Sequence, residues 1–303
     1  MIWRHDFVRN AEPLSNHTSF RIGGPAEFYA EPSTMEELAD LIKSSHHLGV
    51  PVTVLGGGTN CLVADRGVRG LVLHLGRAFR LVKVLPDEEE IDPSMLPTHA
   101  RVQCGASVVT QRLVALAGEH GWADLEMLAG LPGQIGGAVV MNAQNIGQFV
   151  ERVTLVSSKG DMEYLTREQL TFKYRYTALK PGIITEVLFR FPKVDSSVAQ
   201  ERIRRALSYR NDTQELRLPS AGCAFKNPAG QSAGRLIDEA GLKGVRIGDA
   251  QVSFRHANFI VNRGQATCDD VLSLMEHIQR RVAQRSKLWL EPEVRMIGEP
   301  IGL

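Results

Sequence analysis

Three glycine-rich segments in the first half of the chain constrain its fold more than any other feature of the sequence. The first follows an apolar run in the string VTVLGGGTN, and its candidate loop comprises Gly56, Gly57, Gly58, Thr59 and Asn60. Consecutive glycines allow several backbone amides to turn toward one point without Cβ obstruction, which suits a phosphate or pyrophosphate. The loop matches neither GxGxxG nor the P-loop pattern, so both of those nucleotide-binding interpretations lose support. A tight β-turn is the alternative interpretation of this loop alone.

The two other glycine segments extend this pattern. The longer string, AGLPGQIGGAVVMNAQNIG, carries Gly133, Gly136, Gly137 and Asn142, and SFRIGGPA carries Arg21 just before a glycine pair. Glycines among apolar residues let a backbone pack directly against a flat ligand. Three such loops in one domain predict a large dinucleotide rather than a single phosphate. The uncharged stretch around the longer string is long enough for a membrane helix, but its glycines, proline and amides favour a buried loop.

The first two thirds of the chain alternate short β-rich runs with amphipathic helical patterns. Strands are expected at 26–30, 51–55, 71–75, 79–84, 100–104, 152–158 and 183–191. Helices are expected at 35–47, after Ser107, at 198–210, around Leu236 and at 269–289. Thr34 is the expected N-cap of the first helix and Gly49 its end. The composition shifts at the string PKVDSS, which places the expected domain boundary near residue 193.

The overall composition excludes several classes of protein. With 35 basic and 34 acidic side chains among 303 residues, the chain has no overall field to hold a nucleic acid or an anionic membrane. The first residues lack the apolar stretch of a secretory signal, so we expect a cytoplasmic protein. The cysteines show no metal-ligand spacing and indicate neither zinc nor a disulfide framework; they are Cys61, Cys104, Cys223 and Cys268. We expect a monomer that binds no metal, nucleic acid or membrane.

Eight short strings, taken in their order, resemble the UDP-N-acetylenolpyruvoylglucosamine reductases, known as MurB, over essentially the whole chain. They are RIGGPA, LGGGTN, GLPGQIGGAVVMNA, YRYT, GCAFKNP, AGRLIDEAGLKG, HANFIVN and EPEVRMIG. The resemblance implies an α+β architecture. It comprises an FAD-binding domain of the vanillyl-alcohol-oxidase (PCMH) type, with two α+β subdomains, over 1–193, and a smaller substrate-binding domain over 194–303. It also implies that NADPH reduces FAD, and that the reduced flavin converts the enolpyruvyl ether of a UDP-sugar to the lactyl ether of UDP-N-acetylmuramate for peptidoglycan.

The same resemblance assigns roles to individual residues. The family's catalytic arginine matches Arg175 in YRYT, its C-terminal carboxylate matches Glu293, and its proton donor, most often serine, falls on Cys223. The residues expected at the substrate are Tyr174, Lys226, Asn227 and Gln251. For the adjacent Lys226 and Asn227, a turn that ends in proline is an equally good interpretation. The string NAQNIG departs from the commoner NAGAYG-like pattern, and the short chain suggests the shorter subtype of the family.

The implied reaction explains why these residue types are needed. Hydride can add to an electron-rich enol ether only if the neighbouring carboxylate accepts electron density, and Arg175 can hold that carboxylate with two parallel hydrogen bonds. The product is chiral, so a fixed acid must protonate one face. The thiol of Cys223 is a stronger acid than a serine hydroxyl and can serve. Glu293 either donates a proton, orients the cation, or forms a surface ion pair, and the sequence leaves these alternatives open.

Three other functions fit parts of the sequence. Another flavin-dependent sugar oxidoreductase would share the cofactor loops, and a nucleotide-sugar binding protein without redox activity would need Cys223 only for packing. Acyl transfer by Cys223 is a third alternative, but no histidine stands in a recognisable companion motif.

Overall fold

The computed structural model describes all residues except 1–2, 4, 87–97 and 300–303. The chain forms two compact units, and neither is one continuous stretch. Unit 1 comprises 1–8, 30–57 and 73–210, and unit 2 comprises 9–29, 58–72 and 211–303. This division differs from the boundary expected near residue 193, because two N-terminal segments pack with the C-terminal part of the chain. The assignment of FAD and substrate binding to 1–193 and 194–303 stays a prediction.

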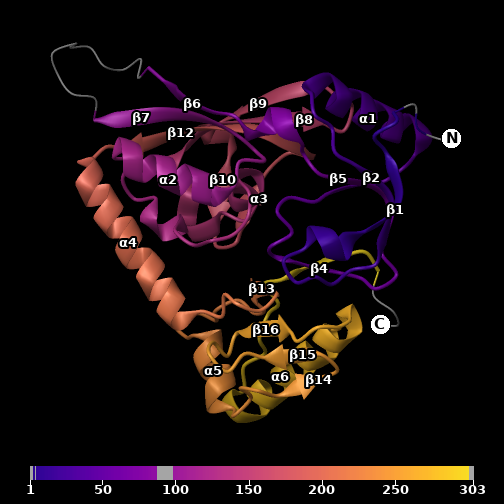
Figure 1. Cartoon of the computed structure of the whole chain (residues 1–303), viewed down its shortest axis with the longest axis vertical. Coiled ribbons are helices and arrows are strands. Elements are labelled where there is room, and N and C mark those ends of the chain that lie inside the picture. Colours follow the sequence, from indigo (N-terminus) through magenta and orange to yellow (C-terminus); the bar gives the residue numbers. More distant parts are fainter. Residues whose placement is uncertain (1–2, 4, 87–97, 300–303) are drawn as a thin grey trace. The chain divides into compact units, whose positions relative to one another are not determined.

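Unit 1 is built on a five-stranded antiparallel sheet with the order β6-β7-β12-β8-β9. Helices α2 and α3 lie along one face of this sheet, and α3 packs against β7 and β12 (Figure 1). The elements are α1 (Met35–Leu48), β3 (Val52–Val54), β6 (Val82–Leu85), β7 (His99–Gly105), α2 (Thr110–His120), α3 (Ile135–Val140), β8 (Val150–Ser157), β9 (Met162–Thr166), β10 (Thr171–Lys173), β11 (Tyr176–Ala178), β12 (Gly182–Pro192) and α4 (Ser196–Thr213), whose last turn passes into unit 2.

Local sequence signals correctly predict the ends of α1. The Thr34 hydroxyl accepts a hydrogen bond from the Glu37 amide at 3.2 Å, and Gly49 ends the helix in the left-handed region at φ 65°. The expectation that the uncharged stretch 127–150 is a buried loop is wrong in part, because Ile135, Ala138 and Val139 are buried and stabilise the short helix α3 despite its two glycines. In the part of the chain that the structure describes, no helix has both the length and the apolar character needed to cross a bilayer.

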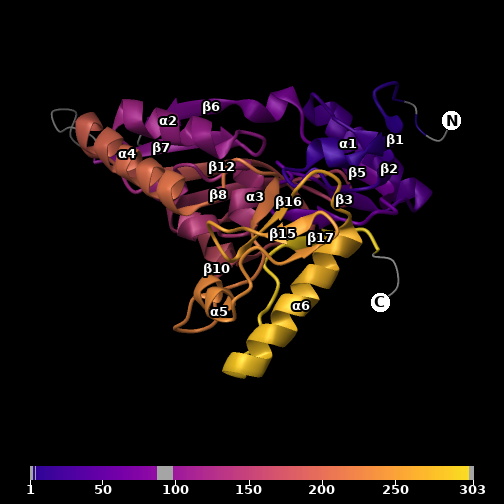
Figure 2. The same ribbon diagram turned by 60° about the horizontal axis from the view of Figure 1, so that its bottom comes forward.

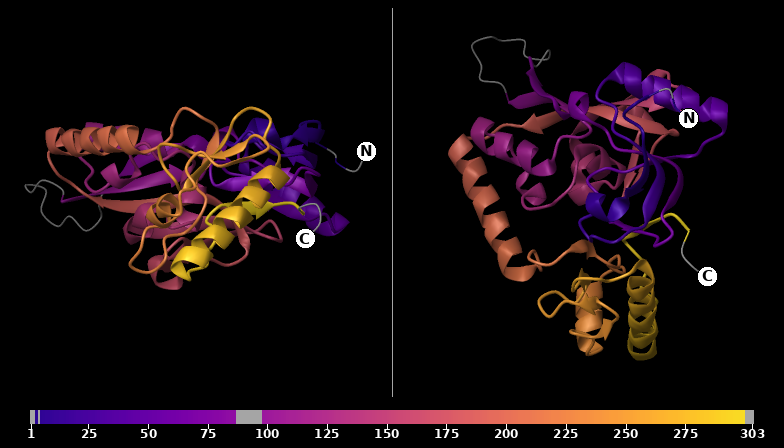
Figure 3. Two further views of the ribbon diagram at one scale, coloured as in Figure 1. Left: turned by 90° about the horizontal axis from the view of Figure 1, so that it is seen from below. Right: turned by 45° about the vertical axis from the view of Figure 1, so that its right-hand side comes forward.

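Unit 2 contains a four-stranded antiparallel sheet with the order β13-β16-β15-β14. Helix α6 covers this sheet (Figure 2), and α5 lies beside α6 (Figure 3, right). The elements are β1 (Arg9–Pro13), β2 (Pro25–Ala30), β4 (Cys61–Val63), β5 (Val68–Leu73), β13 (Ser220–Cys223), α5 (Ala233–Glu239), β14 (Arg246–Ile247), β15 (Ala250–Val252), β16 (Phe259–Asn262), α6 (Cys268–Ser286) and β17 (Arg295–Ile297); β2 and β5 each end one residue beyond the unit. The parallel pair β4–β17 joins an N-terminal segment to the C-terminal one.

Asp65 is a second link between distant segments of unit 2. Its two carboxylate oxygens accept hydrogen bonds from the first backbone amides of α6, at Cys268 (2.8 Å) and Asp269 (3.1 Å). These amides have no partner within the helix, and a negative charge there also interacts favourably with the helix dipole.

We expect Asp65→Ala to lower the free energy of unfolding by about 1–2 kcal/mol, because it removes this cap from α6. Urea denaturation followed by circular dichroism measures the change. The matched control is Arg66→Ala, whose exposed side chain lies next to Asp65 in the same turn and should change stability by less than about 0.5 kcal/mol. Equal losses for the two variants would contradict the capping role.

Candidate active site

In unit 1, two of the predicted glycine loops meet. A Cβ on Gly57 would lie 3.0 Å from the Gly133 Cα, so close packing between the loops favours glycine at that position. Gly136 is similarly close to Ala106, with 3.0 Å between the two Cβ positions. Gly137 is different, since a Cβ there would meet nothing within 4 Å and its φ is not in the left-handed region. Neither backbone conformation nor protein packing explains glycine at position 137.

Asn142 connects the longer glycine loop to a hairpin. Its buried side chain donates from Nδ2 to the Lys173 carbonyl (3.0 Å) and accepts at Oδ1 from the Gly147 amide (3.0 Å). A second bond runs from the Thr177 hydroxyl to the Val139 carbonyl at 2.5 Å. The hairpin formed by β10 and β11 is thereby held at both of its strands. The Asn142 amide thus helps to hold in place the two residues that lie between those strands.

Those residues are Tyr174 and Arg175, which form a two-residue turn closed by the pair Lys173–Tyr176. Arg175 is half-buried and adopts φ 55°, a left-handed conformation that costs a residue with a Cβ about 1–2 kcal/mol. Its guanidinium carbon lies 5.5 Å from the centre of the Tyr174 ring, within the range of a cation–π contact. A glycine would suit this backbone better, so the arginine side chain is present at a conformational cost.

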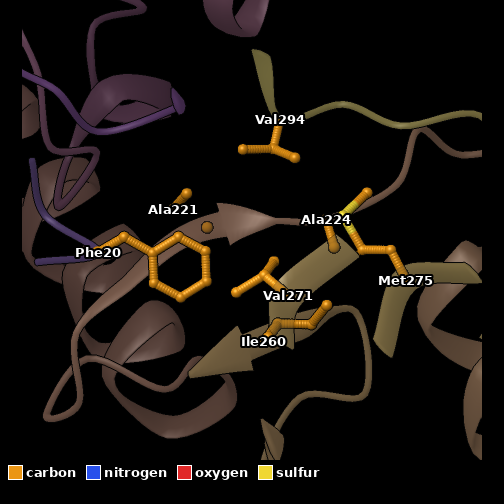
Figure 4. A pocket seen from close by; sticks show the side chains of 8 residues that line it. Phe20, Ala221, Ala224, Ile260, Val271, Met275 and Val294 are labelled. Carbon is orange, nitrogen blue, oxygen red and sulfur yellow. The ribbon is translucent and has the colours of Figure 1, made fainter. Parts of the chain in front are cut away.

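In unit 2, Cys223 ends the strand β13, which is bulged. Ser220 pairs with Val261 and Cys223 with Phe259, so three steps along β13 match two along β16. Bulges change the direction of side chains and are common beside active sites. Ala221 and Ala224 consequently both point into a small apolar pocket, whose labelled lining residues come from β13, β16, α6 and the segments around Phe20 and Val294 (Figure 4). Cys223 does not line this pocket and is half-buried.

Glu293 lies directly beside the strand that carries Cys223. Its backbone amide donates to the Ala224 carbonyl at 2.8 Å, and its carbonyl accepts from the Asn60 side-chain amide at 3.3 Å. The Asn60 carbonyl in turn accepts from the Arg295 amide at 3.0 Å. The backbone of Glu293 is therefore held on both sides. The structure brings together two of the predicted catalytic residues, Cys223 and Glu293, in one unit.

Arg21 and the second half of the first glycine loop also lie together in unit 2. Arg21 is exposed on a tight turn with φ 55°, closed by its amide bond to the Thr18 carbonyl at 3.1 Å. The Gly58 carbonyl accepts from the Ser19 amide at 3.0 Å, and a Cβ on Gly58 would overlap the His17 carbonyl. Thr59 follows in the same loop and is half-buried. Packing alone requires glycine at position 58.

The remaining predicted substrate residues lie in unit 2, at different distances from Cys223. Lys226 and Asn227 directly follow the Cys223 segment; Lys226 pairs with Glu291 at 3.2 Å, and the Asn227 Oδ1 accepts from the Ala233 amide at 3.0 Å. Gln251 lies on β15, where its side chain donates to the Gly244 carbonyl at 3.0 Å. Because β16 separates β15 from β13, the structure does not bring Gln251 next to Cys223.

The other three cysteines differ from Cys223 in their surroundings. Cys61, Cys104 and Cys268 are fully buried, and burial raises the pKa of each thiol to about 12. Each therefore stays protonated at neutral and moderately alkaline pH, and none is accessible to a substrate. Among the four cysteines, only Cys223 has a partly exposed thiol.

Comparisons with known proteins cover nearly the whole chain. A family model described as the C-terminal domain of UDP-N-acetylenolpyruvoylglucosamine reductase matches residues 214–297, and an FAD binding domain model matches 26–165. The UDP-N-acetylenolpyruvoylglucosamine reductase of Syntrophotalea carbinolica is 41% identical, over 97% of this chain and 96% of its own. That of Bacillus licheniformis is 39% identical, over 96% and 94%. The crystal structure of the Thermus caldophilus MurB reductase aligns with a TM-score of 0.78 at 36% identity, covering 96% of this chain and 100% of that one.

Proposed function

The chain belongs to the UDP-N-acetylenolpyruvoylglucosamine reductases, and from this premise we propose how its own residues carry out the reaction. It is an FAD-dependent oxidoreductase of α+β fold that acts on a UDP-sugar in peptidoglycan synthesis, as the resemblance implied. The details that go further are part of the proposal: NADPH as the reductant, a cytoplasmic monomer as the working form, and no nucleic acid as partner. The observation that carries the proposal is the adjacency of Cys223 and Glu293, whose segments are joined by the bond from the Glu293 amide to the Ala224 carbonyl.

The glycine loops of unit 1 fit the cofactor that the family uses. Gly137 is exposed with open space beside it, and glycine inside a helix costs roughly 1 kcal/mol relative to alanine. A flat ligand packed against this backbone accounts for that cost. We therefore assign Gly56, Gly57, Gly133, Gly136 and Gly137 to FAD, with Arg21, Gly58, Thr59, Asn60 and Asn142 as the further expected contacts. When bound, FAD supplies hydride transfer from NADPH to the substrate.

Arg175 is proposed to bind the carboxylate of the enolpyruvyl group. Hydride adds to the terminal methylene carbon, and the electron pair of the double bond moves toward this carboxylate. A guanidinium that makes two parallel hydrogen bonds stabilises the developing charge and stays protonated at all relevant pH values. The adjoining Tyr174 belongs to the same turn and is proposed to contact the substrate there. The left-handed backbone of Arg175 supports this role, because strained backbone conformations are typical of functional sites.

Cys223 is proposed to complete the reaction as the general acid. Its Sγ–H gives a proton to the carbon that bears the ether oxygen, and the thiolate then regains a proton that comes ultimately from solvent. The double bond has gained one hydride and one proton, and NADPH has become NADP⁺. Glu293, held beside this segment, either supplies the returning proton or orients a cation.

Lys226 and Asn227 follow Cys223 and are proposed to bind the phosphates or the sugar. Gln251 is proposed to bind the uridine side.

An anaerobic two-step titration tests the proposed function. The purified protein with FAD should be yellow, lose its flavin absorption on addition of NADPH, and regain it on addition of the enolpyruvyl UDP-sugar. Rapid reoxidation by oxygen without the sugar nucleotide would favour another flavin-dependent sugar oxidoreductase. A protein that takes up no FAD would favour a nucleotide-sugar binding protein without redox activity.

A further inference from the structure

The backbone that follows Cys223 is held by a buried asparagine to which no role has been assigned. Asn258 is 2% exposed and lies in the turn just before β16, closed by the bond from the Phe259 amide to the His256 carbonyl at 2.9 Å. Its Oδ1 accepts from the Phe225 amide at 3.0 Å, and its Nδ2 donates to the Phe225 carbonyl at 2.8 Å. Its own backbone carbonyl accepts from the Ala224 amide at 2.8 Å. One residue therefore makes three hydrogen bonds to the two residues after Cys223.

The Asn258 side chain continues the hydrogen-bond pattern of the sheet beyond the point where regular strand pairing ends. Because β16 begins at Phe259, opposite Cys223, Phe225 lies beyond the end of the β13–β16 pairing, and its isolated antiparallel bridge is to Pro292 instead. The Asn258 side chain presents one acceptor and one donor, as a backbone peptide group does, and takes the place of the missing pair. Phe225 is fully buried, so without this amide both of its backbone groups would lack a partner.

The opposite side of the same segment is held by the chain around Glu293. The Ala224 carbonyl accepts from the Glu293 amide, and the Lys226 amide donates to the Glu291 carbonyl, each at 2.8 Å. The residues after Cys223 are thus fixed between Asn258 on one side and the Glu291–Glu293 segment on the other. A substitution of Asn258 would remove the support on one side of this segment and leave the Cys223 and Glu293 side chains unaltered.

We infer that Asn258 is a positioning residue that sets the direction of the Cys223 thiol for proton transfer. The inference rests on the proposed function of Cys223. A misplacement of about 1 Å in a reacting group can cost about 100-fold in rate. Loss of the Asn258 amide is therefore expected to slow protonation of the substrate, and to leave hydride transfer from NADPH to the cofactor unchanged, since Cys223 takes no part in that half-reaction.

The test measures the two half-reactions separately by anaerobic stopped flow, with rates expressed per bound FAD. For Asn258→Ala we expect flavin reoxidation by the enolpyruvyl substrate to slow by about 10- to 100-fold, with flavin reduction by NADPH within about twofold of the parent. The matched control is Asn262→Ala on β16. Asn262 is equally buried, and its amide bonds to Phe20, Gly264 and Ala266 instead of the Cys223 segment. Its half-reaction rates should stay within about twofold of the parent. Similar slowing in both asparagine variants would overturn the inference, because it would show a general structural effect.

A third variant separates failure of this inference from failure of the proposed function. If Cys223→Ala reoxidises at the parent rate, the proposed role of Cys223 is wrong. If Cys223→Ala is slow and Asn258→Ala is not, the positioning role alone is wrong. Combining both substitutions should give no further slowing beyond Cys223→Ala, since Asn258 acts only through the thiol. Should Asn258→Ala fail to fold, Asn258→Asp keeps the acceptor for the Phe225 amide, and parent-like reoxidation in that variant would overturn the inference equally.

Discussion

Replacing Arg175 with glycine is expected to slow flavin reoxidation by the enolpyruvyl substrate by roughly 10²- to 10³-fold, the usual cost of removing one group that stabilises developing charge. Stability should change little. The glycine relieves a left-handed conformation at φ 55°, which offsets the lost contact between the guanidinium and the Tyr174 ring. We expect the free energy of unfolding to stay within about 1 kcal/mol of the parent. Arg175→Lys keeps the charge but not the paired hydrogen bonds, and should lie between the two rates.

A second arginine in unit 1 provides the control for this prediction. Arg152 also stacks on a tyrosine, with its guanidinium carbon 5.3 Å from the centre of the Tyr164 ring, but it lies on β8 and its φ is not in the left-handed region. Arg152→Ala should leave the reoxidation rate unchanged. If Arg175→Gly reoxidised as fast as the parent, Arg175 would have no place in the mechanism. If it unfolded readily, the strain argument would be wrong.

Short-range features of the fold could be predicted from the sequence, because their causes lie within a few residues. The N-cap of α1 at Thr34 depends on a side-chain bond to the amide three residues ahead, and Gly49 ends α1 by its own conformation. A helix containing Gly136 and Gly137 could not be predicted in the same way. Propensity argues against it, and only burial of its apolar side against the sheet decides the outcome.

The composition of the two units could not be predicted, because no local pattern reports contacts across 200 positions. The Ser19 hydroxyl donates to the Ser220 carbonyl at 2.7 Å, and Asp65 caps α6. When only their sequence neighbours are considered, Ser19 and Asp65 look like ordinary loop residues. The composition shift near residue 193 predicts a domain boundary, and such a shift does not show which earlier segments join the last hundred residues.

The candidate site residues likewise fall into those that the sequence can identify and those that only the structure can identify. The resemblance to the family's motifs identifies the candidates Arg175, Cys223 and Glu293, and the chemistry of the implied reaction explains why such side chains are needed. The asparagines required geometry. The sequence predicts that Asn60 and Asn142 contact the cofactor, which stays a prediction, and the structure adds that their amides bond to the Glu293 carbonyl and to the hairpin that carries Arg175. Asn258 gave one usable signal, a polar residue at the edge of the apolar run FIV, but the sequence cannot show what a buried amide binds.

Substitution of Cys223 is expected to have the largest effect of any single change in unit 2. Cys223→Ala should slow flavin reoxidation by the substrate by roughly 10²- to 10⁴-fold, the usual contribution of a general acid, whereas Cys223→Ser should keep substantial activity because a hydroxyl can also donate a proton. Cys104→Ala is the control. That thiol is buried in β7, and burial raises its pKa to about 12, so its removal should not change the half-reaction rates. Parent-like reoxidation of Cys223→Ala would remove this thiol from the mechanism.

The pH dependence provides an independent test of the same residue. A general acid must be protonated, so activity that depends on a thiol is present below the pKa of that thiol and is lost as the pH rises through it. The parent should therefore lose activity in the alkaline range, and Cys223→Ser should lack that decrease. The three buried cysteines cannot produce it, because a pKa of about 12 keeps them protonated throughout. For the same reason, iodoacetamide at mildly alkaline pH should inactivate the parent and spare Cys223→Ser. An unchanged alkaline decrease in the serine variant would mean that another group controls the profile.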